Sequence, residues 1–286
     1  MTTDNNITSG FTDDIGMMIN DMSVISQTFT DITECYTSKS GHARIFAAKR
    51  FGKRYMLKCL KDDFLMTPAY RLALNKEFEI GVQLDHPNIC HTLSMEEVQG
   101  IGQAIVMEYV DGETLDAFMK ESRLTKQLAR KFVGQLTDAL TYMHNKQILH
   151  RDLKPSNIMV THHGNNIRLI DFSLSDSDTF NIFKAPGGTT GYIAPELMLP
   201  QASADIRSDI YSLGVLMAKM AELCGDRQMK RTASLCMNRN PEKRPANMAE
   251  VTVRPMASAA EIMTIILLSA TAVSLAAYIG IRLAAM

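Results

Sequence analysis

The sequence carries no excess of either charge, since 30 lysine and arginine residues face 31 aspartate and glutamate residues, for a formal net charge of −1. A nucleic-acid-binding domain usually shows a surplus of basic charge, so we expect no nucleic-acid partner. The five cysteines include no C-x-x-C pair, which argues against a zinc site and against a disulfide framework. The N-terminus lacks a basic stretch followed by an apolar run, and we therefore expect no secretory signal peptide.

The distribution of residue types along the chain predicts two lobes of different structure. Hydrophobic residues make up 46% of the chain and charged residues 21%, as in an ordinary globular protein. Asp31 to Val110 contains short β-type runs (ARIFAAKR, KRYMLKCL, AIVMEYV) and one helical segment, TPAYRLALNKEFEIGVQL. Thr114 to about Glu250 is mainly helical in pattern, and the run ending in ILH and the segment NIRLIDF read as short strands at the junction. We expect the lobes to join near Glu108 to Gly112.

The C-terminal region contains a long uncharged segment, IMTIILLSATAVSLAAYIGI, at residues 262–281. Twenty apolar residues can cross a hydrocarbon layer of about 30 Å as a helix. A buried core helix is the alternative. Lys243, Arg244 and Arg254 precede the segment and only Arg282 follows it, which favours a cytoplasmic globular part. We therefore expect a tail-anchored membrane protein.

Small residues recur at four-residue spacing within this segment, at Ala272, Ala276 and Gly280. Such a stripe can bring two membrane helices into close contact, although an alanine-rich helix produces it easily. A homodimer formed through this stripe is one hypothesis for the oligomeric state.

The strongest chemical signal is the string ILHRDLKPSNIM, followed by LIDFS. It supplies a carboxylate, an amine and an amide at Asp152, Lys154 and Asn157, and a second carboxylate at Asp171. Phosphoryl transfer requires a base that orients a hydroxyl, positive charge near the moving phosphoryl group, and oxygen ligands for Mg²⁺. Each residue alone could be an ordinary surface polar group, but the whole string at this spacing indicates phosphoryl transfer.

These motifs resemble those of the serine/threonine protein kinase family, over roughly residues 30 to 250. The resemblance implies ATP and Mg²⁺ as cofactors and protein serine or threonine hydroxyls as substrates. It implies that Asp152 is the catalytic base and that Asn157 and Asp171 hold metal ions. Lys154 is the residue that marks the serine/threonine branch of the family.

The fold that the resemblance implies is the α+β, bilobal protein kinase fold, with a small β-rich N-lobe and a mainly helical C-lobe, followed here by one transmembrane helix. The expected organisation is a flexible lead-in (1–27), a kinase domain (28–250, with lobes 28–110 and 111–250), a linker (251–261), a membrane helix (262–281) and a short tail (282–286).

Lys58, in YMLKCL, occupies the place of the family's strand lysine, which meets the α- and β-phosphates of ATP. A buried ammonium group requires an anionic partner. Glu77 is the candidate for this partner, and Glu79 is the alternative. Glu77 could instead be an exposed helix residue that pairs with Lys76 or Arg71.

The segment IVMEYVDGETL resembles the hinge between the two lobes of a kinase. By this resemblance Met107 lies at the back of the nucleotide pocket, and backbone groups from Glu108 to Val110 meet the adenine edge.

The segment GGTTGYIAPE resembles the end of a kinase activation segment. Thr189 then corresponds to the threonine that hydrogen-bonds the catalytic aspartate and lysine. Glu196 is expected to pair with Arg244 of NPEKRP, and Asp209 is expected to brace the backbone of the catalytic loop.

Arg151 precedes the catalytic aspartate and could pair with a phosphate on the activation segment. We predict phosphorylation within residues 173–190, where the available hydroxyls are Ser173, Ser175, Ser177, Thr179 and Thr190.

The nucleotide loop departs most from the family pattern, because Ser38, Ser40 and Ala43 replace all three glycines. Ile45 stands at the valine position, and Gly41 remains as one flexible point. Glycine lets the backbone approach the phosphates, so its loss should loosen the fit. A serine hydroxyl can itself donate to a phosphate oxygen. We expect weaker nucleotide binding, without its loss.

Two further departures concern the helical lobe. Ser173 replaces the glycine that follows Asp171 and Phe172. The interval between YSLGV and MNRNPEKRP is short and leaves little room for the helix that kinases often use to dock protein partners.

The sequence therefore favours an active, membrane-tethered serine/threonine kinase that transfers the γ-phosphate of Mg-ATP to proteins, including itself. The alternative is a pseudokinase that binds nucleotide and partners with little or no phosphotransfer, since the glycine loop is degraded. A small-molecule kinase is disfavoured by GTTGYIAPE, which resembles a segment that presents a polypeptide hydroxyl.

Overall fold

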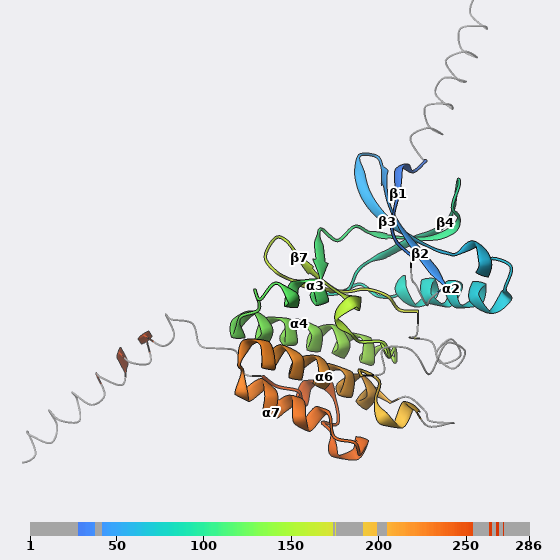
Figure 1. The fold of residues 1–286 in the computed structure, drawn as a ribbon. Helices are drawn as coiled ribbons and strands as arrows, with labels where there is room; N and C mark the ends of the chain where they lie inside the picture. Colours follow the sequence, from blue (N-terminus) through green and yellow to red (C-terminus); the bar gives the residue numbers. More distant parts are fainter. Residues whose placement is uncertain are drawn as a thin grey trace, which may run out of the picture.

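The computed structural model of the protein describes residues 28–37, 42–173, 175, 191–198 and 205–253, together with residues 263, 264, 267, 268 and 271. Figure 1 shows a lobe built on a β-sheet next to a lobe of stacked helices. This arrangement agrees with the two-lobed α+β fold expected from the sequence.

A five-stranded antiparallel sheet forms the first lobe, in the order β1-β2-β3-β5-β4. Phe51 and Gly52 both have positive φ and form the two-residue turn between β2 and β3, as in a tight hairpin. The strands are β1 (Thr30–Thr37), β2 (Ala43–Arg50), β3 (Lys53–Leu60), β4 (Thr92–Val98) and β5 (Gly102–Glu108).

The two faces of this sheet have separate apolar clusters because side chains alternate along a strand. Leu57 and Cys59 lie in the cluster on one face, and Leu60 packs with Leu74 of helix α2 (Pro68–Gly81) in the cluster on the other. Alternation therefore places Lys58 on the same face as Leu60, towards α2.

The second lobe contains four α-helices and a small three-stranded sheet among the described residues. Its main core lies between α4, α6 and the small sheet, where Leu136, Met143, Leu213 and Met217 are fully buried. The elements are β6 (Gly112–Thr114), α3 (Leu115–Lys120), α4 (Lys126–Asn145), β7 (Ile158–Thr161), β8 (Ile167–Leu169), α6 (Ile206–Cys224) and α7 (Arg227–Cys236).

Short 3-10 turns complete the fold, at η1 (Asp62–Phe64), η2 (Pro155–Asn157), η3 (Pro195–Met198), η4 (Pro241–Lys243) and η5 (Met248–Glu250). Helix ends follow local rules. Thr125 accepts the Leu128 N–H at the start of α4, and Gly225 ends α6 with a φ of 71°, which favours glycine.

The strand predicted at ILH is wrong. Ile148 N donates to Met143 O as α4 ends, and His150 N donates to the Asp209 carboxylate. These bonds occupy the backbone groups that a strand would use, so the first strand of this region is β7. Strands β1 and β4 and helix α7 had no separate prediction.

The expected lead-in, most of the linker, most of the membrane helix and the tail lie outside the described residues. Met263, Thr264, Leu267, Leu268 and Thr271, from the expected membrane segment, are helical. Within the part of the chain that the structure describes, no helix combines the length and apolar character needed to cross a membrane. The predicted anchor therefore stays a prediction.

Candidate active site

A buried lysine lies between two carboxylates where the lobes meet. Lys58 Nζ, on β3, lies 2.5 Å from Glu77 Oε1 on α2 and 2.8 Å from Asp171 Oδ1, two residues after β8. Lys58 and Glu77 are each 5% exposed. Glu79, the alternative partner, is exposed and pairs with Lys76 at 2.8 Å.

The pKa values in this cluster are shifted because one cation, Lys58, pairs with two carboxylates. Burial by itself would lower the pKa of Lys58, but Asp171 and Glu77 outweigh burial and raise it. Burial would raise the pKa of Asp171, and Lys58 instead holds it well below its usual range. Burial raises the pKa of Glu77 to about 7, against the opposing effect of Lys58. Of the two carboxylates, Glu77 is therefore the one whose negative charge Lys58 offsets less well against the cost of burial.

Among the described residues, Lys154 and Asn157 hold one oxygen of the Asp152 carboxylate. Lys154 Nζ lies 2.6 Å from Asp152 Oδ2, and Asn157 Nδ2 donates to the same oxygen at 2.8 Å and to the Asp152 carbonyl at 2.9 Å. No described residue donates to Asp152 Oδ1 at hydrogen-bond distance. The side chain is 19% exposed. The described contacts of the carboxylate are thus made through Oδ2.

The loop that carries Asp152 is fixed by a carboxylate beneath it. Asp209, on α6, is fully buried and accepts the N–H groups of His150 at 2.9 Å and Arg151 at 2.8 Å. Its other partner is His144 Nε2 at 2.8 Å, and these donors lower the pKa of Asp209 although burial opposes them. Arg151 has a φ of 61°, a strained conformation for a non-glycine residue, which the bond to Asp209 stabilises.

Asp171 also has a left-handed backbone, with a φ of 70°. Ser173 N donates to Asp171 Oδ1 at 3.2 Å, and Ser173 is absent from the described residues with positive φ. The backbone therefore does not demand glycine at position 173. Phe172 is buried, with its ring 5.8 Å from that of His150.

Asp171 and Asn157 fit the chemistry of a magnesium site. Ile170 N donates to Asn157 O at 3.0 Å, and this bond holds the segment that carries Asp171 next to Asn157. Both amide hydrogens of Asn157 are directed to Asp152, so its Oδ1 is an available acceptor. No cluster of three or more His, Cys, Asp or Glu side chains suited to a metal occurs among the described residues. Mg²⁺ commonly needs only one or two protein oxygens, with substrate phosphates and water supplying the rest.

The expected hinge residues lie at the end of β5. Met107 packs at the edge of the cluster of Leu60 and Ile105, opposite Met56 of β3. Glu108 N donates to His91 O at 3.0 Å, so this N–H is not open to a base. No described residue accepts a hydrogen bond from the Val110 N–H, which fits a role towards adenine.

Sequence patterns did not predict the side-chain network behind the hinge. His91 lies 3.2 Å from Glu108 Oε2 and 2.9 Å from Asp85 Oδ1, and Arg168 lies 3.4 Å from Glu108 Oε1. Arg168 also donates to Ile89 O at 3.2 Å. This network joins the hinge to both lobes, and these residues stand too far apart in the chain to form a motif.

The expected nucleotide loop is described only at its end. Ser38, Ser40 and Gly41 lie outside the described residues, while Ala43 and Ile45 lie in β2, with Ile45 opposite Lys58.

His42, next to this loop, is another residue that no sequence motif predicts. Its ring lies 5.0 Å from that of Tyr70 and 6.5 Å from that of Phe64. Burial, and then the charge of Lys58, lower its pKa to about 4. The end of the loop therefore packs against α2.

Most of the expected activation segment, including Thr189 and Thr190, lies outside the described residues. Of the predicted phosphate acceptors, Ser173 and Ser175 are described. Ser175 is buried, and its hydroxyl donates to His150 O at 3.4 Å. Ser175 is thus poorly placed to meet another kinase molecule.

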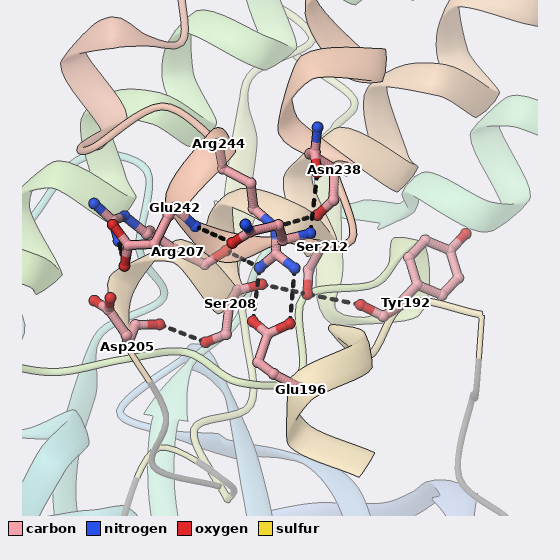
Figure 2. Close-up of polar contacts among 10 residues, drawn as sticks. Tyr192, Glu196, Asp205, Arg207, Ser208, Ser212, Asn238, Glu242 and Arg244 are labelled. Atoms are coloured by element: carbon pink, nitrogen blue, oxygen red, sulfur yellow. Dashed lines mark hydrogen bonds and ion pairs between the residues drawn. The ribbon is translucent and has the colours of Figure 1, made fainter. Parts of the chain in front are cut away.

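A second buried ion pair lies inside the helical lobe (Figure 2). Arg244 Nη1 and Nη2 lie 2.6 and 2.7 Å from the two oxygens of Glu196. The same guanidinium donates to Asn238 O at 2.7 Å and to Arg207 O at 2.9 Å. The predicted partner of Glu196 is therefore present, and the pair joins η3 to the start of α6 and to η4.

Comparison with known proteins identifies the family. The protein kinase domain model matches residues 28–243, so the chain belongs to the protein kinase domain family. Protein kinases use ATP and Mg²⁺, which agrees with the oxygen ligands at Asn157 and Asp171.

Curated relatives are serine/threonine kinases of greater length. The chain is 34% identical over 176 residues to the serine/threonine-protein kinase PknB of Mycobacterium leprae, covering 59% of this chain and 28% of that protein. It is 31% identical over 186 residues to the serine/threonine-protein kinase PrkC of Bacillus subtilis, covering 63% and 28%. The chain thus spans less than a third of the length of these two relatives.

Solved structures resemble the fold at lower identity. The crystal structure of the Mycobacterium tuberculosis PknI kinase domain matches with a TM-score of 0.59 and 23% identity, over 79% of this chain and 95% of that one. This likeness supports the fold alone.

Proposed function

We propose that the protein is an active serine/threonine protein kinase that transfers the γ-phosphate of Mg-ATP to protein hydroxyls, including its own. The main support is that Lys58 contacts both Glu77 and Asp171, while Lys154 and Asn157 hold Asp152. The family and its curated serine/threonine kinase relatives support the same activity.

Each residue of the site has one task in this mechanism. Lys58 binds the nucleotide phosphates, and Glu77 holds its ammonium group in place. Asp152 orients the substrate hydroxyl through Oδ1 and accepts its proton, while Lys154 supplies positive charge near the transferred group. Asp171 and Asn157 would hold Mg²⁺, which, when bound, neutralises charge on the phosphates.

The experiment follows transfer of labelled γ-phosphate by the purified full-length chain to itself and to a generic Ser/Thr substrate. We expect transfer by the wild type and losses on the order of 100-fold or more for Lys58→Met and Asp171→Asn, because both remove charge that contacts phosphate or metal. Lys53→Gln, an exposed change on the same strand, is the control and should leave the rate unchanged.

A pseudokinase is the second candidate, because Ser38, Ser40 and Ala43 replace the loop glycines. No transfer by the wild type, with nucleotide binding still detected by thermal shift, would support this candidate over the active kinase.

We also propose that residues 262–281 tether the kinase domain to the cytoplasmic side of a membrane. The segment is uncharged over 20 residues, and Met263, Leu267 and Leu268 are helical and at least 64% exposed. Flotation of the full chain with liposomes tests this proposal. Leu267→Glu with Leu268→Glu should abolish flotation, because charge within a membrane span is costly.

A further inference from the structure

Helix α7 is a basic amphipathic helix at the end of the helical lobe away from the five-stranded sheet (Figure 1). Met229, Ala233 and Cys236 are buried on its inner side. Arg227, Lys230, Arg231, Ser234 and Leu235 are all exposed, and their spacing places them on one outer face. Exposed Arg239 follows the helix.

The basic residues of this face have no carboxylate partners in the part of the chain that the structure describes. Among the described residues, none of Arg227, Lys230, Arg231 and Arg239 forms an ion pair, whereas surface cations such as Lys49 are paired with nearby acids. The sequence from 227 to 241 contains no aspartate or glutamate.

The acids that flank this segment are already engaged. Asp226 is buried and bound by Arg130 at 2.6 Å, and Glu242 is bound by Arg207. Glu222, on α6, and Glu250, on η5, are exposed, but two acids against four cations still leave an excess of positive charge here, in a chain whose net charge is −1.

The same helix stands beside the point where the described domain ends. Thr232 Oγ1, on α7, donates to Thr252 O at 3.4 Å. Nine residue steps separate Val253 from Ile262, and a fully extended chain covers at most about 32 Å over that length. An inserted anchor would therefore hold this end of the domain close to the membrane surface, where lysine and arginine interact with anionic lipid.

We propose that the outer face of α7, with Arg227, Lys230, Arg231 and Arg239, rests on the headgroups of an anionic membrane leaflet. The inference rests on the proposed membrane anchor. Since the five-stranded sheet lies at the opposite end of the molecule, this docking directs the nucleotide cleft away from the lipid and leaves it open to protein substrates.

The test uses the full chain in nanodiscs of phosphatidylcholine alone or with phosphatidylserine. A donor dye is placed at Ser234→Cys in a Cys35→Ser background, because Cys35 is the exposed native cysteine of the described residues. An acceptor dye on the lipid headgroups reports energy transfer. We expect strong transfer in anionic discs that falls in phosphatidylcholine and at high salt.

The decisive variant is Arg227→Gln with Lys230→Gln and Arg231→Gln, which should lower the ratio of docked to undocked protein on the order of 100-fold. The matched control removes three exposed cations elsewhere: Lys53→Gln, Arg71→Gln and Lys120→Gln. It should leave energy transfer unchanged. Equal transfer in both variants would overturn the proposal.

The outcomes also separate the anchor from the docking face. A chain that does not enter nanodiscs of either composition disproves the anchor. A chain that enters the discs, with energy transfer independent of phosphatidylserine, disproves docking alone. Binding of an acidic peptide that the triple variant loses, without any dependence on lipid charge, would assign the face to a protein partner and overturn the membrane proposal.

Discussion

Two buried ionic clusters of this molecule, one between the lobes and one in the helical lobe, use similar bonds but differ in charge balance. In the cluster between the lobes, Lys58 serves two carboxylates, Glu77 and Asp171, so the cluster has one negative charge in excess. In the helical lobe, Arg244 meets one carboxylate, Glu196, through two hydrogen bonds. One cluster is unbalanced and the other is neutral.

The remaining donors show the same contrast. Arg244 gives two further N–H groups to the Asn238 and Arg207 carbonyls, so four of its five N–H donors bind protein oxygens. Lys58 has three N–H donors, and two are directed to carboxylates that a magnesium ion or a conformational change could draw away. A neutral pair whose donors are mostly bound to protein oxygens favours a structural role, whereas an unbalanced cluster between the two lobes favours a functional one.

The sharpest test of the comparison is removal of the structural cation. Arg244→Ala should lower the free energy of unfolding by about 4 kcal/mol, because it leaves Glu196 without its partner in a mostly buried site. Denaturant unfolding measures this loss. Phosphotransfer per folded molecule, measured at low temperature, should change less than about threefold.

Arg244→Lys keeps the charge but loses the two-pronged contact, so it should lie between the wild type and Arg244→Ala in stability. Loss of transfer in fully folded Arg244→Lys would contradict the assignment of this pair to structure alone.

The unbalanced cluster predicts a pH dependence of stability. Burial raises the pKa of Glu77 to about 7, from an ordinary value of 4.5. Between these values the folded protein binds the proton more tightly than the unfolded chain, so stability falls as pH rises from about 4.5 to 7 and then levels off. The fall should be at most roughly 3 kcal/mol.

Glu77→Gln isolates this effect, because the other titrating groups are common to both proteins. Unfolding curves without nucleotide or Mg²⁺ should show the wild type losing stability relative to Glu77→Gln between pH 5 and 7.5. A difference that stays constant with pH would show that Glu77 titrates normally. The variant should also transfer phosphate more slowly, since Lys58 loses one of its two carboxylate partners.

Packing between α6 and α7 gives a prediction about the stability of the helical lobe alone. A Cβ added at Gly214 would lie 2.6 Å from Cys236 Cβ and 3.1 Å from Ala233 O. Gly214→Ala should therefore destabilise the protein by about 2 kcal/mol, because the two helices must separate. Thermal unfolding measures the effect.

Gly134 on α4 offers the matched control, since its added Cβ would meet no atom within 4 Å. Gly134→Ala should stabilise by up to about 1 kcal/mol, through helix propensity. If both variants were equally stable, α6 and α7 would not be packed as closely as described.

The sequence predicts contacts well where a motif fixes both partners and poorly where the fold brings single residues together. The pairs Lys58–Glu77 and Glu196–Arg244 each join two recognisable motifs, and both are present. Helix α7 had no separate prediction, because its exposed basic residues leave few apolar positions. The strand expected at ILH failed because Asp209, 59 residues away, takes the backbone of His150.

The network behind the hinge shows why some contacts stay hidden from the sequence. Glu108, at the end of β5, contacts His91, which comes just before β4. It also contacts Arg168, the middle residue of β8. No spacing rule connects residues that are 17 and 60 positions away from Glu108. Only the assembled lobes place them together.

This network, most of which is half-buried, predicts a smaller effect than the two buried clusters do. Hydrogen bonds to Asp85 and Glu108 raise the pKa of His91 above 6.5, although burial opposes them. The stabilisation is therefore fully present below about pH 6.5 and is lost as pH rises through the raised pKa. Since the His91 side chain is 35% exposed, solvent screening limits the effect to about 0.5 kcal/mol.

His91→Gln should remove this dependence of stability on pH in unfolding curves from pH 5.5 to 8.5. Both proteins carry Glu77→Gln, so that the larger titration of Glu77 does not obscure the effect. A loss of 2 kcal/mol or more would show that the hinge network is as tightly coupled to the fold as the buried clusters are.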